Sequence, residues 1–192
     1  ASDVYKRQVM YNEYKGNRGG FFMRPFVSVV VPILNGEGVV GACLESLLNQ
    51  TYPRDRYEVI VVDNGSTDNT REIVSRFPVV LLSETGRRTS YAARNRGVQS
   101  SRGEIVAFTD ADCVAEKDWL QMGVDGFEES VGCVAGGIKP ANPTSWVGEY
   151  LRERNYMSHL KVVEAFGSQQ YAQTANAFYR REVFEAVGFF EA

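Results

Sequence analysis

The sequence has no long hydrophobic run, one histidine, three cysteines and no excess of positive charge. Of its 192 residues, 21 are Lys or Arg and 24 are Asp or Glu, so the formal net charge is −3. This balance argues against broad binding to nucleic-acid phosphates. The longest apolar runs, residues 27–31 and 79–82, are far shorter than the roughly 20 residues of a membrane-spanning helix. We therefore expect a globular domain, with any peripheral membrane association belonging to the full-length protein.

The scarcity of cysteine and histidine excludes further kinds of chemistry. Cys43, Cys113 and Cys133 are widely spaced and form no CxxC pair, which favours reduced thiols in a cytoplasmic protein. His159 is the only histidine, so we expect neither a zinc site nor Ser–His catalysis. The 44% of hydrophobic residues is nevertheless ordinary for a folded domain.

Two regions differ in composition. Residues 1–24 hold five Lys or Arg against two acids, together with three glycines and no sustained apolar period. Such a segment is expected to be a loosely ordered N-terminal tail. Residues 25–192 are expected to form the folded domain.

From Phe26 onward, apolar strand patterns alternate with helical patterns. Strands are expected at residues 27–31, 57–62, 79–82, 105–109, 131–135 and 175–179. Helices are expected around residues 40–48, from Asn69 with Glu72 completing a capping box, and at 91–100, 119–127, 146–160 and 181–187. Near-continuous apolar strands alternating with helices predict an α/β fold, in which helices cover both faces of a mostly parallel central sheet.

Acidic residues follow two of the expected strands. Asp63 ends one strand, and Asp110-Ala111-Asp112 follows another. The carboxyl ends of parallel strands meet at one edge of a sheet, where such folds bind ligands. Although they are 110 − 63 = 47 residues apart in sequence, Asp63 and Asp110 should therefore share one crevice.

The Asp110/Asp112 pair is the strongest candidate for a metal site. Two carboxylates at i and i+2 bring hard oxygen ligands to one divalent cation, and Mg²⁺ or Mn²⁺ completes its shell with phosphate oxygens. Such a site suits a nucleoside diphosphate, in which the metal neutralises the leaving group. Taken alone the spacing is common, and a helix N-cap at Asp112 is the plainer interpretation.

Two further segments carry candidate ligand-binding side chains. Asp63 can accept hydrogens from a base or a ribose hydroxyl, although an Asx-turn is an alternative, and Asp68 is expected to cap the next helix. In the segment "YAARNRG", Arg94 offers a fork for phosphate or a carbonyl, and Asn95 offers an amide. A solvated charged face is the alternative for Arg94, and the favoured interpretation for Arg96.

Taken together, five segments resemble family 2 glycosyltransferases of the GT-A fold. They are "VSVVVPILNGEG", "EVIVVDNGSTDNT", "AARNRG", "GEIVAFTDADC" and "TANAFYRREVFEAVGFFEA". The resemblance covers about Phe26 to Ala192 and implies a three-layer sandwich with a Rossmann-like nucleotide-binding half. It says nothing about which sugar is transferred.

The resemblance also implies roles for individual residues. Nucleotide contacts are implied for Pro32, Asn35, Asp63, Arg94, Asn95 and Asp110. A divalent metal, Mn²⁺ or Mg²⁺, is implied at Asp110 and Asp112, and contacts to the donor sugar or acceptor at Gly137, Thr174 and Asn176. Ile33-Leu34 departs from the polar and aromatic residues that the family often has there, which weakens that contact.

The implied reaction is an inverting transfer of sugar from a nucleotide-diphospho-sugar to an acceptor hydroxyl. A UDP-sugar donor and a sugar or lipid-linked acceptor are expected, in polysaccharide or glycolipid synthesis in the cytoplasm or at the cytoplasmic face of the membrane. The general base is expected in an acidic pair beyond Ala192. Residues 25–192 are therefore expected to be a catalytic domain that is incomplete at its C-terminus.

Alternative functions remain open at this point. A sugar-nucleotide pyrophosphorylase shares a similar layered sheet, but it should show a Gly-rich, basic loop after the first strand, and "PILNGEG" has no basic residue. A non-catalytic sugar-nucleotide binding module would keep Asp63 and lose the metal-binding acids. A plain flavodoxin-like binding domain would leave "DAD" and "ARNRG" unexplained.

Overall fold

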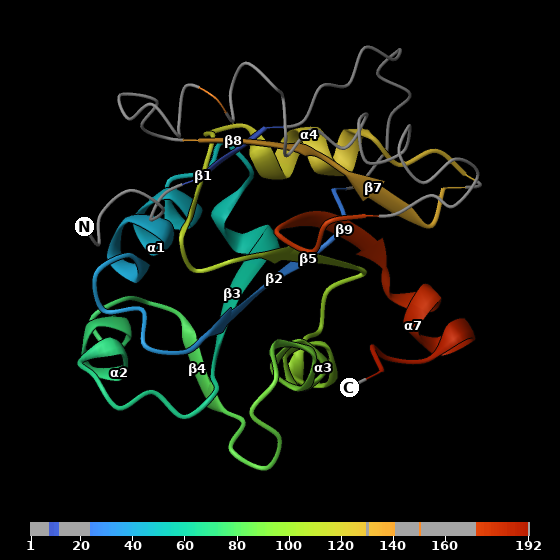
Figure 1. Cartoon of the computed structure of the whole chain (residues 1–192). Helices are drawn as coiled ribbons and strands as arrows, with labels where there is room; N and C mark the ends of the chain where they lie inside the picture. The colour runs from blue at the N-terminus through green and yellow to red at the C-terminus, as the bar shows by residue number, and fades with distance from the viewer. Residues whose placement is uncertain (1–7, 12–23, 130, 141–149, 151–171, 192) are drawn as a thin grey trace.

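The computed structural model describes residues 8–11, 24–129, 131–140, 150 and 172–191 (Figure 1). The main sheet has the strand order β4-β3-β2-β5-β9-β7. Four neighbouring strands are parallel: β4 (Val80–Ser83), β3 (Tyr57–Asp63), β2 (Val27–Ile33) and β5 (Ile105–Thr109). Strand β9 (Asn176–Arg180) pairs antiparallel with β5, and β7 (Cys133–Ala135) pairs antiparallel with β9.

Helices cover both faces of this sheet, and alternate strand residues face each layer. On one face, Val29 and Val31 of β2 pack with helices α1 (Val40–Leu48), α2 (Thr70–Val74) and α4 (Trp119–Asp125). On the other, Val30 packs with helices α3 (Ser90–Ser100) and α7 (Arg181–Val187). Because the central strands are buried on both sides, their apolar runs are continuous. The predicted three-layer α/β arrangement is confirmed.

A second, small sheet lies outside the main one. Its order is β6-β1-β8, with β1 (Gln8–Tyr11) parallel to β6 (Cys113–Ala115) and antiparallel to β8 (Gly137–Pro140). The loosely ordered segment expected over residues 1–24 therefore contains a paired strand. No local sequence pattern predicts β1, because so short a strand gains its stability from backbone hydrogen bonds to segments about 100 residues away.

Element boundaries differ from the predictions in a few places. Strand β2 continues through Pro32 to Ile33, and a short 3₁₀ helix (Arg54–Arg56) precedes β3. The capping box predicted at the start of α2 is wrong, because Asn69 makes no side-chain capping bond and Glu72 pairs with Arg76 instead. The helix expected at 146–160, with His159, lies outside the described residues apart from one helical position, Tyr150.

In the part of the chain that the structure covers, no helix has both the length and the apolar character needed to cross a membrane.

Candidate functional site

The candidate site lies where the parallel strands end. Asn35 follows β2, Asp63 and Ser83 are the last residues of β3 and β4, and Asp110 follows β5. The strands pair in register, with Ile33 opposite Asp63 and Asp63 opposite Ser83. The acids predicted to share one edge of the sheet are therefore at that edge.

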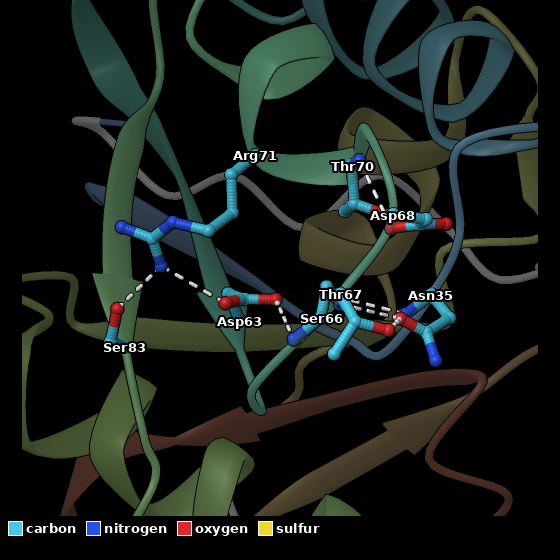
Figure 2. Close-up of polar contacts among 8 residues, drawn as sticks. All are labelled: Asn35, Asp63, Ser66, Thr67, Asp68, Thr70, Arg71 and Ser83. Carbon is cyan, nitrogen blue, oxygen red and sulfur yellow. Dashed lines mark hydrogen bonds and ion pairs between the residues drawn. The ribbon is translucent and has the colours of Figure 1, made fainter.

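The loops after β2 and β3 are joined by hydrogen bonds (Figure 2). Asn35 has a φ of 51°, in the left-handed region that asparagine tolerates better than most residues. Its backbone N–H donates to Ser66 Oγ at 2.9 Å, and its side-chain Oδ1 accepts from the Thr67 N–H at 2.8 Å. The Gly36 N–H donates to Thr70 Oγ1 at 2.8 Å. Asn35, implied to be a nucleotide contact, thus holds the two loops together.

Asp68 caps the start of α2 and also binds the β2 loop. Its Oδ1 accepts from the Thr70 N–H, and its Oδ2 from the Glu37 N–H, both at 3.1 Å. Glu37 reciprocates, because its Oε2 accepts from the Asn69 N–H at 3.0 Å. Burial alone would raise the pKa of Asp68, but hydrogen bonds from the Thr70 hydroxyl and from the Glu37 and Thr70 N–H groups outweigh it and lower the pKa. The predicted capping role of Asp68 is confirmed.

Asp63 is buried at the end of β3, and both of its oxygens have partners (Figure 2). Oδ1 accepts from the Ser66 N–H at 3.1 Å, as in an Asx-turn, and Oδ2 forms an ion pair with Arg71 Nη1 at 2.9 Å. Burial by itself would raise the pKa of Asp63, yet hydrogen bonds from Ser66 and Arg71 and the Arg71 charge lower it. The carboxylate is therefore ionised at neutral pH.

Arg94 and Asp110 are brought together by α3 and β5. Arg94 Nη2 donates to Asp110 Oδ1 at 2.7 Å, and the Arg94 side chain is almost fully buried. The solvated-face alternative is therefore wrong for Arg94. Arg94 Nε and Asn64 Oδ1 are buried polar atoms that have no hydrogen-bond partner among the residues that the structure describes. Such atoms are costly in a folded protein and are common where a ligand completes the site.

Asp112 is partly buried and lies two residues after Asp110. Burial, and then the negative charge of Asp110, raise its pKa, while Cys113 Sγ donates a weak bond to its Oδ1 at 3.8 Å. A divalent cation would relieve this repulsion, so the two hard carboxylates fit Mg²⁺ or Mn²⁺. Among the described residues no group of three or more His, Cys, Asp or Glu side chains gathers around a metal position.

Asn95 makes an unexpected long-range contact. Its Nδ2 donates to the Phe190 carbonyl at 2.8 Å, and its Oδ1 accepts from the Phe190 N–H at 3.0 Å. The side-chain amide implied to contact the nucleotide is thus engaged with backbone 95 residues away. Arg96, the next residue of α3, is exposed, as the sequence predicts.

The residues implied on the donor or acceptor side lie around β9. Asn176 is fully buried, its Oδ1 accepting from Trp119 Nε1 at 2.8 Å and its Nδ2 donating to the Gly137 carbonyl at 2.9 Å. Asn176 and Gly137 therefore join β9, α4 and β8 from within. Thr174 is partly exposed in the turn before β9, and Pro32 is partly exposed opposite Val62.

Arg71 is the residue at this edge that the sequence analysis missed. It lies in the first turn of α2 and bridges the ends of β3 and β4, contacting Asp63 and Ser83 (Figure 2). The sequence offers only a weak signal for this contact, namely an arginine eight residues after Asp63, in the first turn of the helix that follows the loop. Only the pairing of β3 with β4 brings Ser83 within its reach.

Comparison with known proteins places the chain in a family. The family model described as glycosyl transferase family 2 matches residues 28–188. The chain therefore belongs to glycosyl transferase family 2, and the predicted resemblance is confirmed.

Among curated proteins, glycosyltransferase AglE of Haloferax volcanii is 37% identical over 170 residues, which cover 85% of this chain and 55% of that protein. A poly(ribitol-phosphate) beta-glucosyltransferase of Bacillus spizizenii is 36% identical over 92 residues, 45% of this chain and 14% of that protein. The chain thus spans about half the length of the first of these relatives and less of the second.

Solved structures share the fold. A mannosyltransferase of Pyrobaculum calidifontis, in complex with GDP-Man and Mn²⁺, has a TM-score of 0.68 at 29% identity, over 92% of this chain and 51% of that one. Glucosyl-3-phosphoglycerate synthase of Mycobacterium tuberculosis, in complex with UDP, has a TM-score of 0.62 at 19% identity, over 94% and 74%. These likenesses confirm the GT-A type of sandwich.

Proposed function

We propose that the protein transfers a sugar from a nucleotide-diphospho-sugar to an acceptor hydroxyl, with inversion at the anomeric carbon and with a divalent metal. The observation that carries this proposal is the set of charged groups at the carboxyl edge of the sheet. Asp63 ends β3 and pairs with Arg71 of α2. Arg94 of α3 pairs with Asp110, which directly follows β5, and Asp112 lies two residues further on. These positions suit a nucleoside at one end of the edge and a diphosphate with metal at the other.

The metal part of the proposal rests on Asp110 and Asp112. Asp112 has no ion-pair partner among the described residues, and the negative charge of Asp110 raises its pKa. Bound there, Mn²⁺ or Mg²⁺ would supply positive charge to the departing diphosphate. The protein's own contribution is to hold the acids in place: Arg94 fixes Asp110 through an ion pair to its Oδ1.

Uracil and guanine are the two candidate bases of the donor nucleotide. The sequence analysis expected a UDP-sugar, and the synthase mentioned above was solved with UDP. The mannosyltransferase, which is more similar to this chain, was solved with GDP-Man. Both nucleotides therefore belong in the test.

The remaining features of the proposal concern the whole protein. A sugar or lipid-linked acceptor in polysaccharide or glycolipid synthesis is proposed, at or near the cytoplasmic face of a membrane. The three widely spaced cysteines, which form no CxxC pair, are consistent with a reducing compartment. A general base must accept the proton of the attacking hydroxyl, and we assign this base to no residue of the described part of the chain.

The test is calorimetry of UDP and GDP binding with Mn²⁺, and again with EDTA. Binding of one nucleotide should require the metal, and Asp112→Asn should weaken it by about 1.5–3 kcal/mol, the typical value of a hydrogen bond to a charged group. Asp118→Asn is a matched control, because Asp118 is exposed and makes no side-chain capping bond. Equal affinity with EDTA, or in the Asp112 variant, would contradict the metal site.

A non-catalytic sugar-nucleotide binding module is the alternative. The Asp110/Asp112 pair favours the enzyme, because simple binding of a base does not need two acids beside the diphosphate. Family membership argues against the pyrophosphorylase. Slow metal-dependent hydrolysis of a donor, followed by proton NMR of the first anomer released, would distinguish the enzyme from the module, and a retained anomeric configuration would contradict inversion.

A further inference from the structure

The acid expected to contact the base has almost no exposed surface. The Asp63 side chain is 2% exposed, and its two oxygens already accept from the Ser66 N–H and from Arg71 Nη1. What the edge presents to a ligand at this point is therefore the guanidinium of Arg71, whose side chain is 49% exposed.

Arg71 is held in place by two neighbouring strand ends (Figure 2). Nη1 donates to Asp63 Oδ2 at 2.9 Å and to Ser83 Oγ at 2.6 Å, and these two residues are paired in register. Its Nε and Nη2 make no hydrogen bond to any residue that the structure describes. A planar guanidinium fixed at one nitrogen keeps its other donors in a defined direction.

We infer that Arg71 is the residue that selects the nucleobase, and that Asp63 and Ser83 are positioning residues that act through it. This inference rests on the proposed function, in that it assumes a nucleotide at this edge. A guanidinium only donates hydrogen bonds, so it favours a base that offers a carbonyl oxygen. Uracil and guanine have such an oxygen. Adenine has an amino donor where guanine has O6.

Asp63 is essential to this arrangement although it need not touch the base. The ionised carboxylate supplies the charge that keeps the flexible Arg71 side chain in one geometry, which reduces the entropy lost when a ligand binds. The assignment differs from direct recognition by Asp63 in one measurable respect. If Asp63 contacts the base itself, Arg71 merely covers it, and removing Arg71 should leave binding unchanged or strengthen it.

The experiment measures calorimetric affinities of the whole 192-residue chain, with Mn²⁺, for UDP, GDP, ADP and pyrophosphate. In the unmodified chain we expect UDP or GDP to bind at least about tenfold more tightly than ADP. This ratio of affinities corresponds to the free energy of one charge-assisted hydrogen bond. Arg71→Met should remove most of this preference while leaving pyrophosphate affinity unchanged. Arg71→Lys should restore part of it, because an ammonium donates without the planar geometry.

Arg76→Met provides the matched control. Arg76 follows the same helix, is well exposed and pairs with Glu72 on the helix surface, so base preference should not change. Pyrophosphate affinity also reports whether each variant is folded.

Unchanged or tighter UDP and GDP binding by Arg71→Met, or ADP binding equal to theirs in the unmodified chain, would overturn the inference and leave the proposed function standing. Metal-dependent binding of none of the four ligands would instead overturn the proposed function, and this inference with it.

Discussion

At the scale of single residues, the site combines one acid whose ionised form is stabilised with another whose ionised form is penalised. Hydrogen bonds and an arginine lower the pKa of Asp63, whereas burial and a neighbouring carboxylate raise that of Asp112. The first arrangement stabilises the fold at neutral pH and the second destabilises it. A carboxylate whose pKa is raised, as that of Asp112 is, is common where a protein binds a ligand of opposite charge.

Asp112→Asn is therefore expected to stabilise the ligand-free chain while weakening metal-dependent binding. Because the native state binds the Asp112 proton more tightly than the unfolded state, wild-type stability falls as pH rises through the interval between the ordinary and the raised pKa. The variant lacks this loss, so it should be more stable than the unmodified chain at neutral pH and equally stable in acid below the ordinary pKa of aspartate. Urea unfolding at several pH values measures this, and destabilisation at neutral pH would contradict it.

Asn35 is expected to contribute through its backbone as well as its side chain. Both Asn35→Gly and Asn35→Ala lose the bond from the Thr67 N–H, but only alanine is strained at a φ of 51°. Alanine should thus cost about 1–2 kcal/mol more than glycine. Equal free energies of unfolding for the two variants would contradict a left-handed Asn35.

At the scale of elements, close packing of α3 against β2 is what brings Arg94 to the site. Gly97 sits on that interface, and a Cβ there would lie 2.3 Å from Val30 Cγ1. Val30 is fully buried in a central strand and has little room to move. Gly97→Ala should therefore destabilise the protein by about 1–3 kcal/mol through overpacking.

Gly41→Ala supplies the contrast in the same experiment. Gly41 lies in α1, and a Cβ there meets no atom within 4 Å. The higher helix propensity of alanine should raise stability by up to about 1 kcal/mol. Thermal unfolding of both variants checks the pair, and a shift of the same sign in both would show that packing at Gly97 is not the cause.

The elements that could be predicted from sequence are those whose burial follows from local pattern. Strands β2, β3 and β5 carry continuous apolar runs, and α1 repeats leucines at helical spacing, so their positions follow directly. Strands β1, β6 and β8 have three or four residues each and exist through pairing with distant segments, which no local pattern encodes. The same limit applies to side chains: Asp63 and Asp110 were predictable at, and directly after, the ends of strands, whereas the Arg71–Ser83 contact needed the strand order.

At the scale of the whole molecule, polar side chains connect segments that are far apart in sequence around one edge of the sheet. Arg94 pairs with Asp110, Trp119 donates to Asn176, and Asn95 holds the backbone of Phe190. The rings of Phe108, Tyr179, Phe184 and Phe190 also pack against one another beneath this last contact. The parallel half of the sheet is thereby joined to the segment after α7, where the exposed Phe189 lies.

The contact between Asn95 and Phe190 separates two roles for this asparagine. If Asn95 serves mainly to hold the segment after α7, Asn95→Ala should accelerate hydrogen exchange of the Phe190 amide, whose acceptor it removes, by roughly tenfold or more. Binding of UDP or GDP with Mn²⁺ should then be little changed. Arg96→Ala, at the exposed neighbouring position, should affect neither measurement. A loss of nucleotide affinity with unchanged exchange at Phe190 would instead establish Asn95 as the direct nucleotide contact that the family resemblance implies. The two outcomes are distinguishable because the exchange experiment needs no ligand.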